Sequence, residues 1–71
     1  MDAHRLVAMA NDIANYFESE PDREAGIDGI ADHLRKFWDP RMRRQLIAYL
    51  EADGDGLGEL ARAGVQRLAA S

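Results

Sequence analysis

The sequence predicts a small all-α domain, and three patterns support that prediction. Apolar residues recur at helical spacing along most of the 71 residues. Two proline-containing breaks and one glycine-rich turn divide the chain into four segments. No segment alternates apolar and polar residues as a half-buried strand does. We therefore expect one helical domain over residues 1–71, with short helices at about 3–18, 22–38, 40–52 and 57–69.

The first helix is expected at about 3–18, with Asp2 as its N-cap. Its core face is formed by apolar residues spaced three or four apart, namely Leu6, Met9, Ala10, Ile13 and Phe17, widened by Val7, Ala14 and Tyr16. Pro21 then interrupts the pattern. Because proline lacks an N–H, it suits the first turn of the next helix.

The second helix is expected at about 22–38. Its apolar face consists of Ile27, Ile30, Ala31, Leu34, Phe37 and Trp38. On a helical projection, Gly26, Gly29, His33 and Phe37 fall beside the core stripe rather than within it. The two glycines are poor helix formers. They are either tolerated weak points or a thinned surface that lets another helix backbone approach closely.

Asp39 and Pro40 separate the second helix from the third. A residue before proline avoids the helical region, Asp is a strong N-cap, and Pro is favoured at the first helical position. The third helix should bury Met42, Leu46, Tyr49 and Leu50, with Ile47 at the edge. The turn Asp53-Gly54-Asp55-Gly56 should end it. The fourth helix should bury Leu57, Leu60, Ala61, Gly64, Val65 and Leu68.

Composition limits the classes of function. The chain has no Cys, which excludes disulfides and thiolate ligands. It shows no signal-type apolar run and nothing near the roughly 20 apolar residues of a membrane span, so we expect a cytoplasmic protein without membrane contact. A domain this small often depends on a partner for stability.

Chemically active clusters are missing from the sequence. Asp53, Asp55 and Glu59 lack the spacing of a calcium-binding EF-hand loop. His4 and His33 have no second ligand at metal spacing, and no phosphate-binding glycine loop is present. The two Ser residues lack a nucleophile context. We expect no catalytic, cofactor-binding or metal-binding residue in this chain.

A basic and aromatic cluster stands out instead. Arg35 and Lys36 suit the end of a helix, but Arg41, Arg43 and Arg44 at the start of the next helix are not explained by the helix dipole. Arg and aromatic residues are enriched at protein interfaces. Trp38 suits either the core or such an interface. The expected partner-binding residues are His33, Arg35, Lys36, Phe37, Trp38, Asp39, Pro40, Arg41, Arg43 and Arg44.

Two alternatives remain for this cluster. It can be a solvated surface, or it can be part of a small helical nucleic-acid-binding module, since short helices meeting near a basic corner are similar to helix-turn-helix proteins. The net charge of −4 and the absence of a basic recognition helix argue against nucleic acid.

The sequence of residues 29–43 closely resembles the central signature of one protein family. These residues are Gly-Ile-Ala-Asp-His-Leu-Arg-Lys-Phe-Trp-Asp-Pro-Arg-Met-Arg. This family is the delta subunit of the soluble molybdenum-containing NAD-dependent formate dehydrogenases. Residues 7–13, Tyr16-Phe17, Leu57 and residues 63–68 extend the resemblance over nearly the whole chain. The turn at 53–58 is where we expect variation.

The resemblance implies a non-catalytic accessory subunit or assembly factor of a cytoplasmic complex that oxidises formate to carbon dioxide with reduction of NAD. The expected partners are the large subunits, which carry the molybdenum pterin cofactor, iron–sulfur clusters, flavin and the NAD site, whereas this chain holds none. The alternative role is a transient chaperone for insertion of the molybdenum cofactor. The isolated chain is a possible homodimer.

Overall fold

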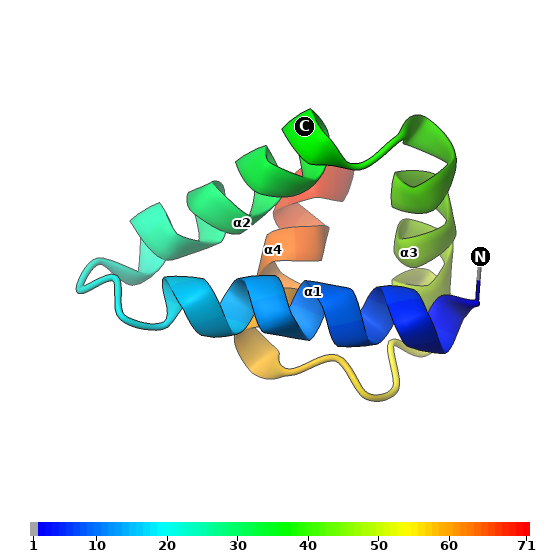
Figure 1. Ribbon diagram of the computed structural model, residues 1–71, viewed down its shortest axis with the longest axis horizontal. Helices are drawn as coiled ribbons and strands as arrows, with labels where there is room; N and C mark the ends of the chain where they lie inside the picture. The colour runs from blue at the N-terminus through cyan, green and yellow to red at the C-terminus, as the bar shows by residue number, and fades with distance from the viewer. Residues whose placement is uncertain (1) are drawn as a thin grey trace.

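The computed structural model describes residues 2–71 and places four helices in them. They are α1 (Ala3–Phe17), α2 (Arg23–Phe37), α3 (Pro40–Ala52) and α4 (Glu59–Ala70). In Figure 1, α1 runs across the front, α2 diverges from it after the first loop, and α3 stands near the start of α1. α4 lies behind them and contacts each of the other three. The predicted all-α fold is confirmed.

Three aspartates fix where the first three helices begin. The side chain of Asp2 accepts a hydrogen bond from the His4 N–H at 3.1 Å, and Asp39 accepts one from Met42 at 2.9 Å. Asp22 caps α2 in the same way, accepting from the Glu24 N–H at 3.1 Å. α2 therefore begins one residue later than expected, and Pro21 lies before the cap rather than in the first turn.

The last helix also begins later than predicted, at residue 59 instead of 57. The glycine turn ends α3, because Gly54 takes a left-handed φ of 74° and donates its N–H to Tyr49 O at 2.9 Å. Leu57 then belongs to a tight turn, donating to Gly54 O, and Gly58 becomes the N-cap of α4. Leu57 is nevertheless buried, as expected.

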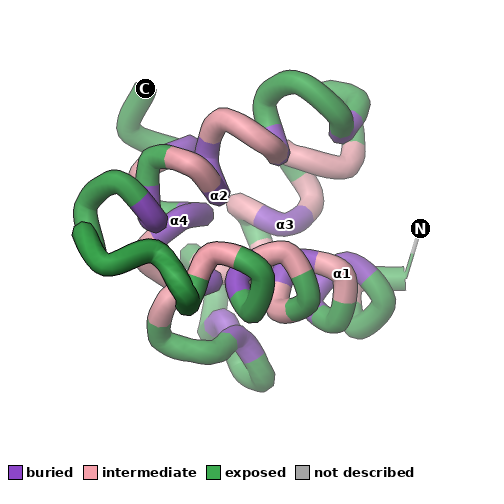
Figure 2. The backbone as a smooth tube through the Cα atoms, turned by 60° about the vertical axis from the view of Figure 1, so that its left-hand side comes forward, coloured by how far each residue is buried: buried purple, intermediate pink, exposed green. Residues whose placement is uncertain are grey.

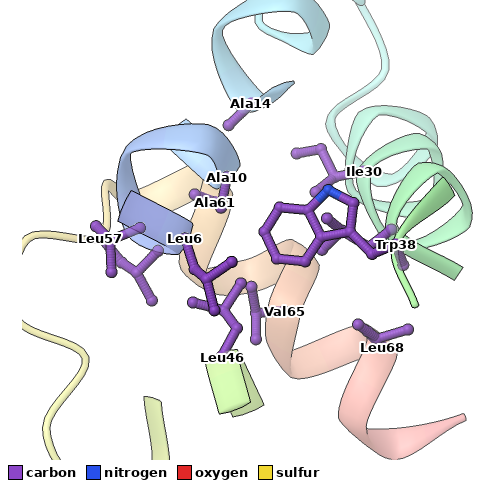
Figure 3. Packing of buried hydrophobic residues seen from close by; sticks show 13 residues of the cluster. Leu6, Ala10, Ala14, Ile30, Trp38, Leu46, Leu57, Ala61, Val65 and Leu68 are labelled. Carbon is purple, nitrogen blue, oxygen red and sulfur yellow. The ribbon is translucent and has the colours of Figure 1, made fainter. Parts of the chain in front are cut away.

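The core lies where the four helices converge, and Figure 3 shows Trp38 near its centre. All four helices contribute, as the burial pattern in Figure 2 shows. The buried cluster consists of Leu6, Val7, Ala10, Ala14, Ile30, Ala31, Leu34, Trp38, Leu46, Leu57, Ala61, Val65 and Leu68. Met42, Ile47, Tyr49 and Leu50 pack against it from α3, partly buried.

Two residues counted in the apolar sets of their helices are on the surface. Tyr16 is 77% exposed and Phe37 is 73% exposed. Both stand at the edge of an apolar stripe, where helical spacing cannot decide burial. Phe37 also ends α2, whereas Trp38 takes an extended backbone (φ −95°, ψ 143°) and buries its indole. Because the backbone changes from helical to extended at residue 38, the adjacent side chains of Phe37 and Trp38 differ in burial.

The glycines of α2 allow the end of α1 to pack closely, in line with the second of the two interpretations above. A Cβ atom at Gly26 would lie 3.3 Å from the Phe17 carbonyl oxygen. At Gly29 a Cβ would overlap the Phe17 ring, so here the close neighbour is a side chain and not backbone. Gly64 of α4 is similarly needed, because a Cβ there would overlap Ile30 of α2.

Candidate protein-docking surface

The sequence cluster is centred on the corner between α2 and α3. Only Trp38 and Asp39 separate the two helices. Trp38 fixes the corner to the core, and Asp39 with Pro40 starts α3. These three residues therefore build the corner, and the side chain of Trp38 is withdrawn from any surface contact in this structure.

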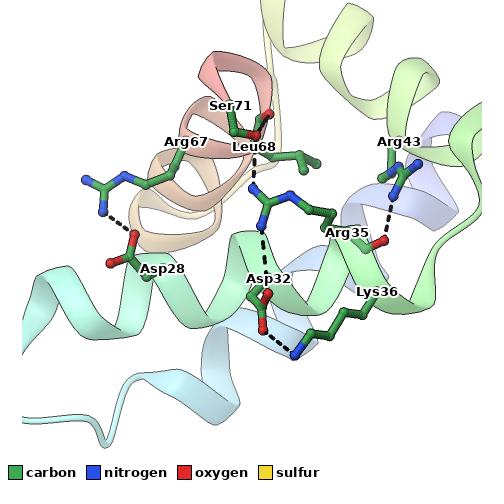
Figure 4. Close-up of polar contacts among 8 residues, drawn as sticks. All are labelled: Asp28, Asp32, Arg35, Lys36, Arg43, Arg67, Leu68 and Ser71. Carbon is green, nitrogen blue, oxygen red and sulfur yellow. Dashed lines mark hydrogen bonds and ion pairs between the residues drawn. The ribbon is translucent and has the colours of Figure 1, made fainter.

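The two basic residues at the end of α2 have partners within the chain (Figure 4). Lys36 Nζ lies 3.0 Å from a carboxylate oxygen of Asp32, one turn back on the same helix. Arg35 lies 3.7 Å from Asp32 and donates to the Ser71 hydroxyl at 2.9 Å. These pairs are exposed, so each contributes little to stability. They do fix the directions of the two side chains.

Arg43 has a structural role that the helix-dipole argument missed. Its Nη1 donates to the carbonyl oxygen of Arg35 at 2.5 Å, across the corner (Figure 4). That carbonyl is in the last turn of α2, where no intrahelical donor is available. The guanidinium at the start of α3 therefore serves the end of α2, which explains its place without a partner protein.

Arg41 and Arg44 are different. Both are exposed, and within residues 2–71 neither side chain forms a hydrogen bond or an ion pair. Phe37 is close to them in sequence and exposes most of its side chain, and its ring packs against His33 with ring centroids 4.8 Å apart. We call Phe37, Arg41 and Arg44 the exposed corner.

Beside His33, which the sequence analysis assigned to the partner surface, the structure adds four residues of α1. A shallow groove between α1 and α2 is lined by Asp12, Ile13, Tyr16, Phe17 and His33. Since His33 also contacts Phe37, the apolar surface continues from the exposed corner into this groove. The only signal in the sequence was the position of Tyr16 at the edge of its helical stripe.

A second charged cluster braces α4 against α2. Arg67 contacts Asp28 at 2.7 Å and Glu24 at 2.6 Å. The hydrogen bonds to Asp28 and then Glu24 raise the pKa of Arg67. This arginine is therefore committed to the fold, in contrast to Arg41 and Arg44.

The described residues show no metal centre and no membrane span. Across residues 2–71, no group of three or more His, Cys, Asp or Glu side chains is placed to hold a metal ion. No helix in the same range is long and apolar enough to cross a membrane.

Comparisons with known proteins place the chain in a family. The model of the family described as NADH-dependent formate dehydrogenase delta subunit FdsD matches residues 5–65 of the 71. Comparisons with curated proteins and with solved structures gave no match. The matched range includes α1, α2 and α3 except for the first two residues of α1, and it also includes the exposed corner. The chain belongs to the NADH-dependent formate dehydrogenase delta subunit family.

Proposed function

We propose that this chain is a non-catalytic accessory subunit that docks onto a large subunit of a cytoplasmic formate dehydrogenase through its exposed corner. The observation that carries the proposal is the exposure of Phe37, at 73%, at the end of α2, together with two arginines in the first turns of α3 that lack partners within residues 2–71. Burying a side chain of this kind contributes about 1.5–3 kcal/mol. Arg and aromatic residues are the types that dominate binding energy at protein interfaces.

In this proposal the large subunits and the delta chain have different roles. The large subunits carry the molybdenum pterin cofactor, the iron–sulfur clusters, the flavin and the NAD site. The delta chain contributes a rigid helical corner, because Trp38 and Arg43 hold the ends of α2 and α3 together. Phe37 then acts as an apolar anchor, and Arg41 and Arg44 act as flanking donors.

The proposal is tested by co-expressing the chain with the large subunits and purifying the complex through a tag on a large subunit. We expect the double variant Phe37→Ser/Arg41→Glu to lose co-purification while its circular dichroism spectrum stays helical. The matched control is Arg5→Glu, which makes the same charge change at another exposed arginine. Unchanged recovery and unchanged formate oxidation with the double variant would contradict docking through the corner.

The same purification separates a permanent subunit from a transient chaperone. A permanent subunit remains in the mature, molybdenum-loaded enzyme in a fixed ratio to the large subunits. A chaperone is recovered only with large subunits that lack the molybdenum cofactor. We expect the fixed ratio, measured by quantitative mass spectrometry of the purified mature enzyme.

A further inference from the structure

A small hollow on the α4 side of the corner has an unusual lining. Three arginines, Arg35, Arg43 and Arg44, border it, and Ile47 and Leu68 supply apolar surface. Figure 4 shows two of these arginines, with Arg35 directed at Ser71 and Arg43 crossing to the Arg35 carbonyl. We call this the three-arginine hollow.

Hydrogen-bond accounting shows a surplus of donors in the hollow. Each guanidinium offers five N–H donors and no acceptor. Two oxygen atoms at the hollow each accept one of these donors: Arg35 O accepts from Arg43, and the Ser71 hydroxyl oxygen accepts from Arg35. The Ser71 hydroxyl gives its own proton to Leu68 O at 2.8 Å.

One of the three arginines has a carboxylate partner, because Arg35 pairs with Asp32. Within residues 2–71, Arg43 and Arg44 form no ion pair, and Arg35 reaches only Asp32 at 3.7 Å. The hollow is therefore a local positive site on a chain whose net charge is −4. An extended polyanion such as nucleic acid would meet repulsion from the rest of the surface, whereas a short acidic group would not.

The volume of the hollow and its apolar residues indicate which kind of ligand it can bind. Its volume of about 270 Å³ is below the roughly 300–1,000 Å³ of small-molecule sites, so it fits a side chain better than a nucleotide cofactor. Ile47 and Leu68 can cover the aliphatic stem of such a side chain. Guanidinium groups match the two oxygens of a carboxylate in a bidentate geometry.

We infer that the three-arginine hollow binds the carboxylate of a Glu or Asp side chain from an acidic segment of the partner subunit. The inference rests on the proposed docking function and adds the chemistry of the partner. Arg44 is the principal ligand residue, since Arg35 and Arg43 also hold the corner together.

A direct test uses the full chain and a blocked octaglutamate peptide at low salt, followed by NMR of the arginine Nε–Hε groups. We expect saturable shifts at Arg43 and Arg44, and none at Arg62 or Arg67, whose guanidiniums are bound to Gly54 O and to acids of α2. Equal shifts at all arginines, or none, would overturn the inference. Equal responses to inorganic phosphate or to an oligonucleotide would also overturn the assignment to an acidic protein segment.

The second test measures the complex. Arg44→Glu should weaken co-purification at least tenfold, Arg44→Lys should retain part of it because the charge stays while the bidentate fork is lost, and Arg5→Glu should have no effect. If Arg44→Glu binds normally while Phe37→Ser/Arg41→Glu does not, the hollow is not a carboxylate site, and the proposed docking function stands with Phe37 and Arg41 as its contacts and without Arg44. If neither variant affects binding, both proposals fail.

Discussion

Arginines occur in two regions of the molecule, and their surroundings differ. One region is the side of α2 that faces α4, and the other is the corner where α2 meets α3. On the α4 side, Arg67 is held by Asp28 and Glu24, and Gly64 gives room to Ile30. At the corner, Arg41, Arg43 and Arg44 form no ion pair within residues 2–71. An arginine with an acceptor inside the chain contributes to the fold, whereas the proposed function uses the arginines that lack such an acceptor.

The corner itself contains the same contrast between neighbours. Trp38 is buried and Phe37 is exposed, although both were expected on one apolar face. Arg43 crosses to α2, whereas Arg41 and Arg44 lack partners within residues 2–71. Measuring stability and partner binding for matched variants separates these two roles.

The largest effect on stability is expected from Trp38→Ala. Removing a buried Trp costs about 3–5 kcal/mol, which is much of the roughly 4–10 kcal/mol expected for a chain of this size. Urea unfolding followed by circular dichroism measures the loss. Phe37→Ala is the matched control, and it should change stability by about 0.5 kcal/mol or less because its ring is exposed. Equal losses would break the distinction between the two aromatic residues.

Gly64→Ala should give the next largest effect, about 1–3 kcal/mol of destabilisation from overpacking. The new methyl would meet the Cβ and Cγ2 atoms of Ile30, which lies fully inside the core. Gly29→Ala is the control, because its neighbour Phe17 is only partly buried and its ring can move. The measurement is again urea unfolding, and a neutral Gly64→Ala variant would show that α2 and α4 have room to separate.

Arg43→Ala should cost about 1 kcal/mol, the typical value of one hydrogen bond, since it removes the donor to Arg35 O. Arg41→Ala should leave stability within about 0.5 kcal/mol. In the co-purification assay we expect the larger loss from Arg41→Ala. If Arg41→Ala destabilises the isolated chain more than Arg43→Ala does, the division between structural and docking arginines is wrong.

The smallest effect is expected from Arg67→Ala, whose ion pairs are exposed and screened by salt. The thermal midpoint should fall slightly at low salt and less at high salt. Because the pKa of Arg67 is raised, its contribution is complete below the pKa of the unfolded chain and is lost only as pH rises through the higher folded pKa. The difference from wild type should therefore stay constant through neutral pH.

The sequence alone determined the helices and most of their ends. Helical spacing placed Leu6, Ile30, Leu34 and Val65 in the core, because residues three and four apart share one face of a helix. The Asp39-Pro40 pair fixed the start of α3 for local steric and hydrogen-bonding reasons. The positions of the caps at Asp22 and Gly58 differed from expectation by one or two residues, since several nearby residues can serve as caps.

Only the tertiary structure decided which members of the basic and aromatic cluster are exposed. Burial of Trp38 and exposure of Phe37 depend on the backbone turn at residue 38 and on the helices opposite. Arg41 and Arg43 are the same residue type in the first turn of the same helix, but of these two only Arg43 donates a hydrogen bond to a carbonyl oxygen across the corner. Helical spacing describes one helix at a time, whereas the partner of a side chain depends on the packing of two helices.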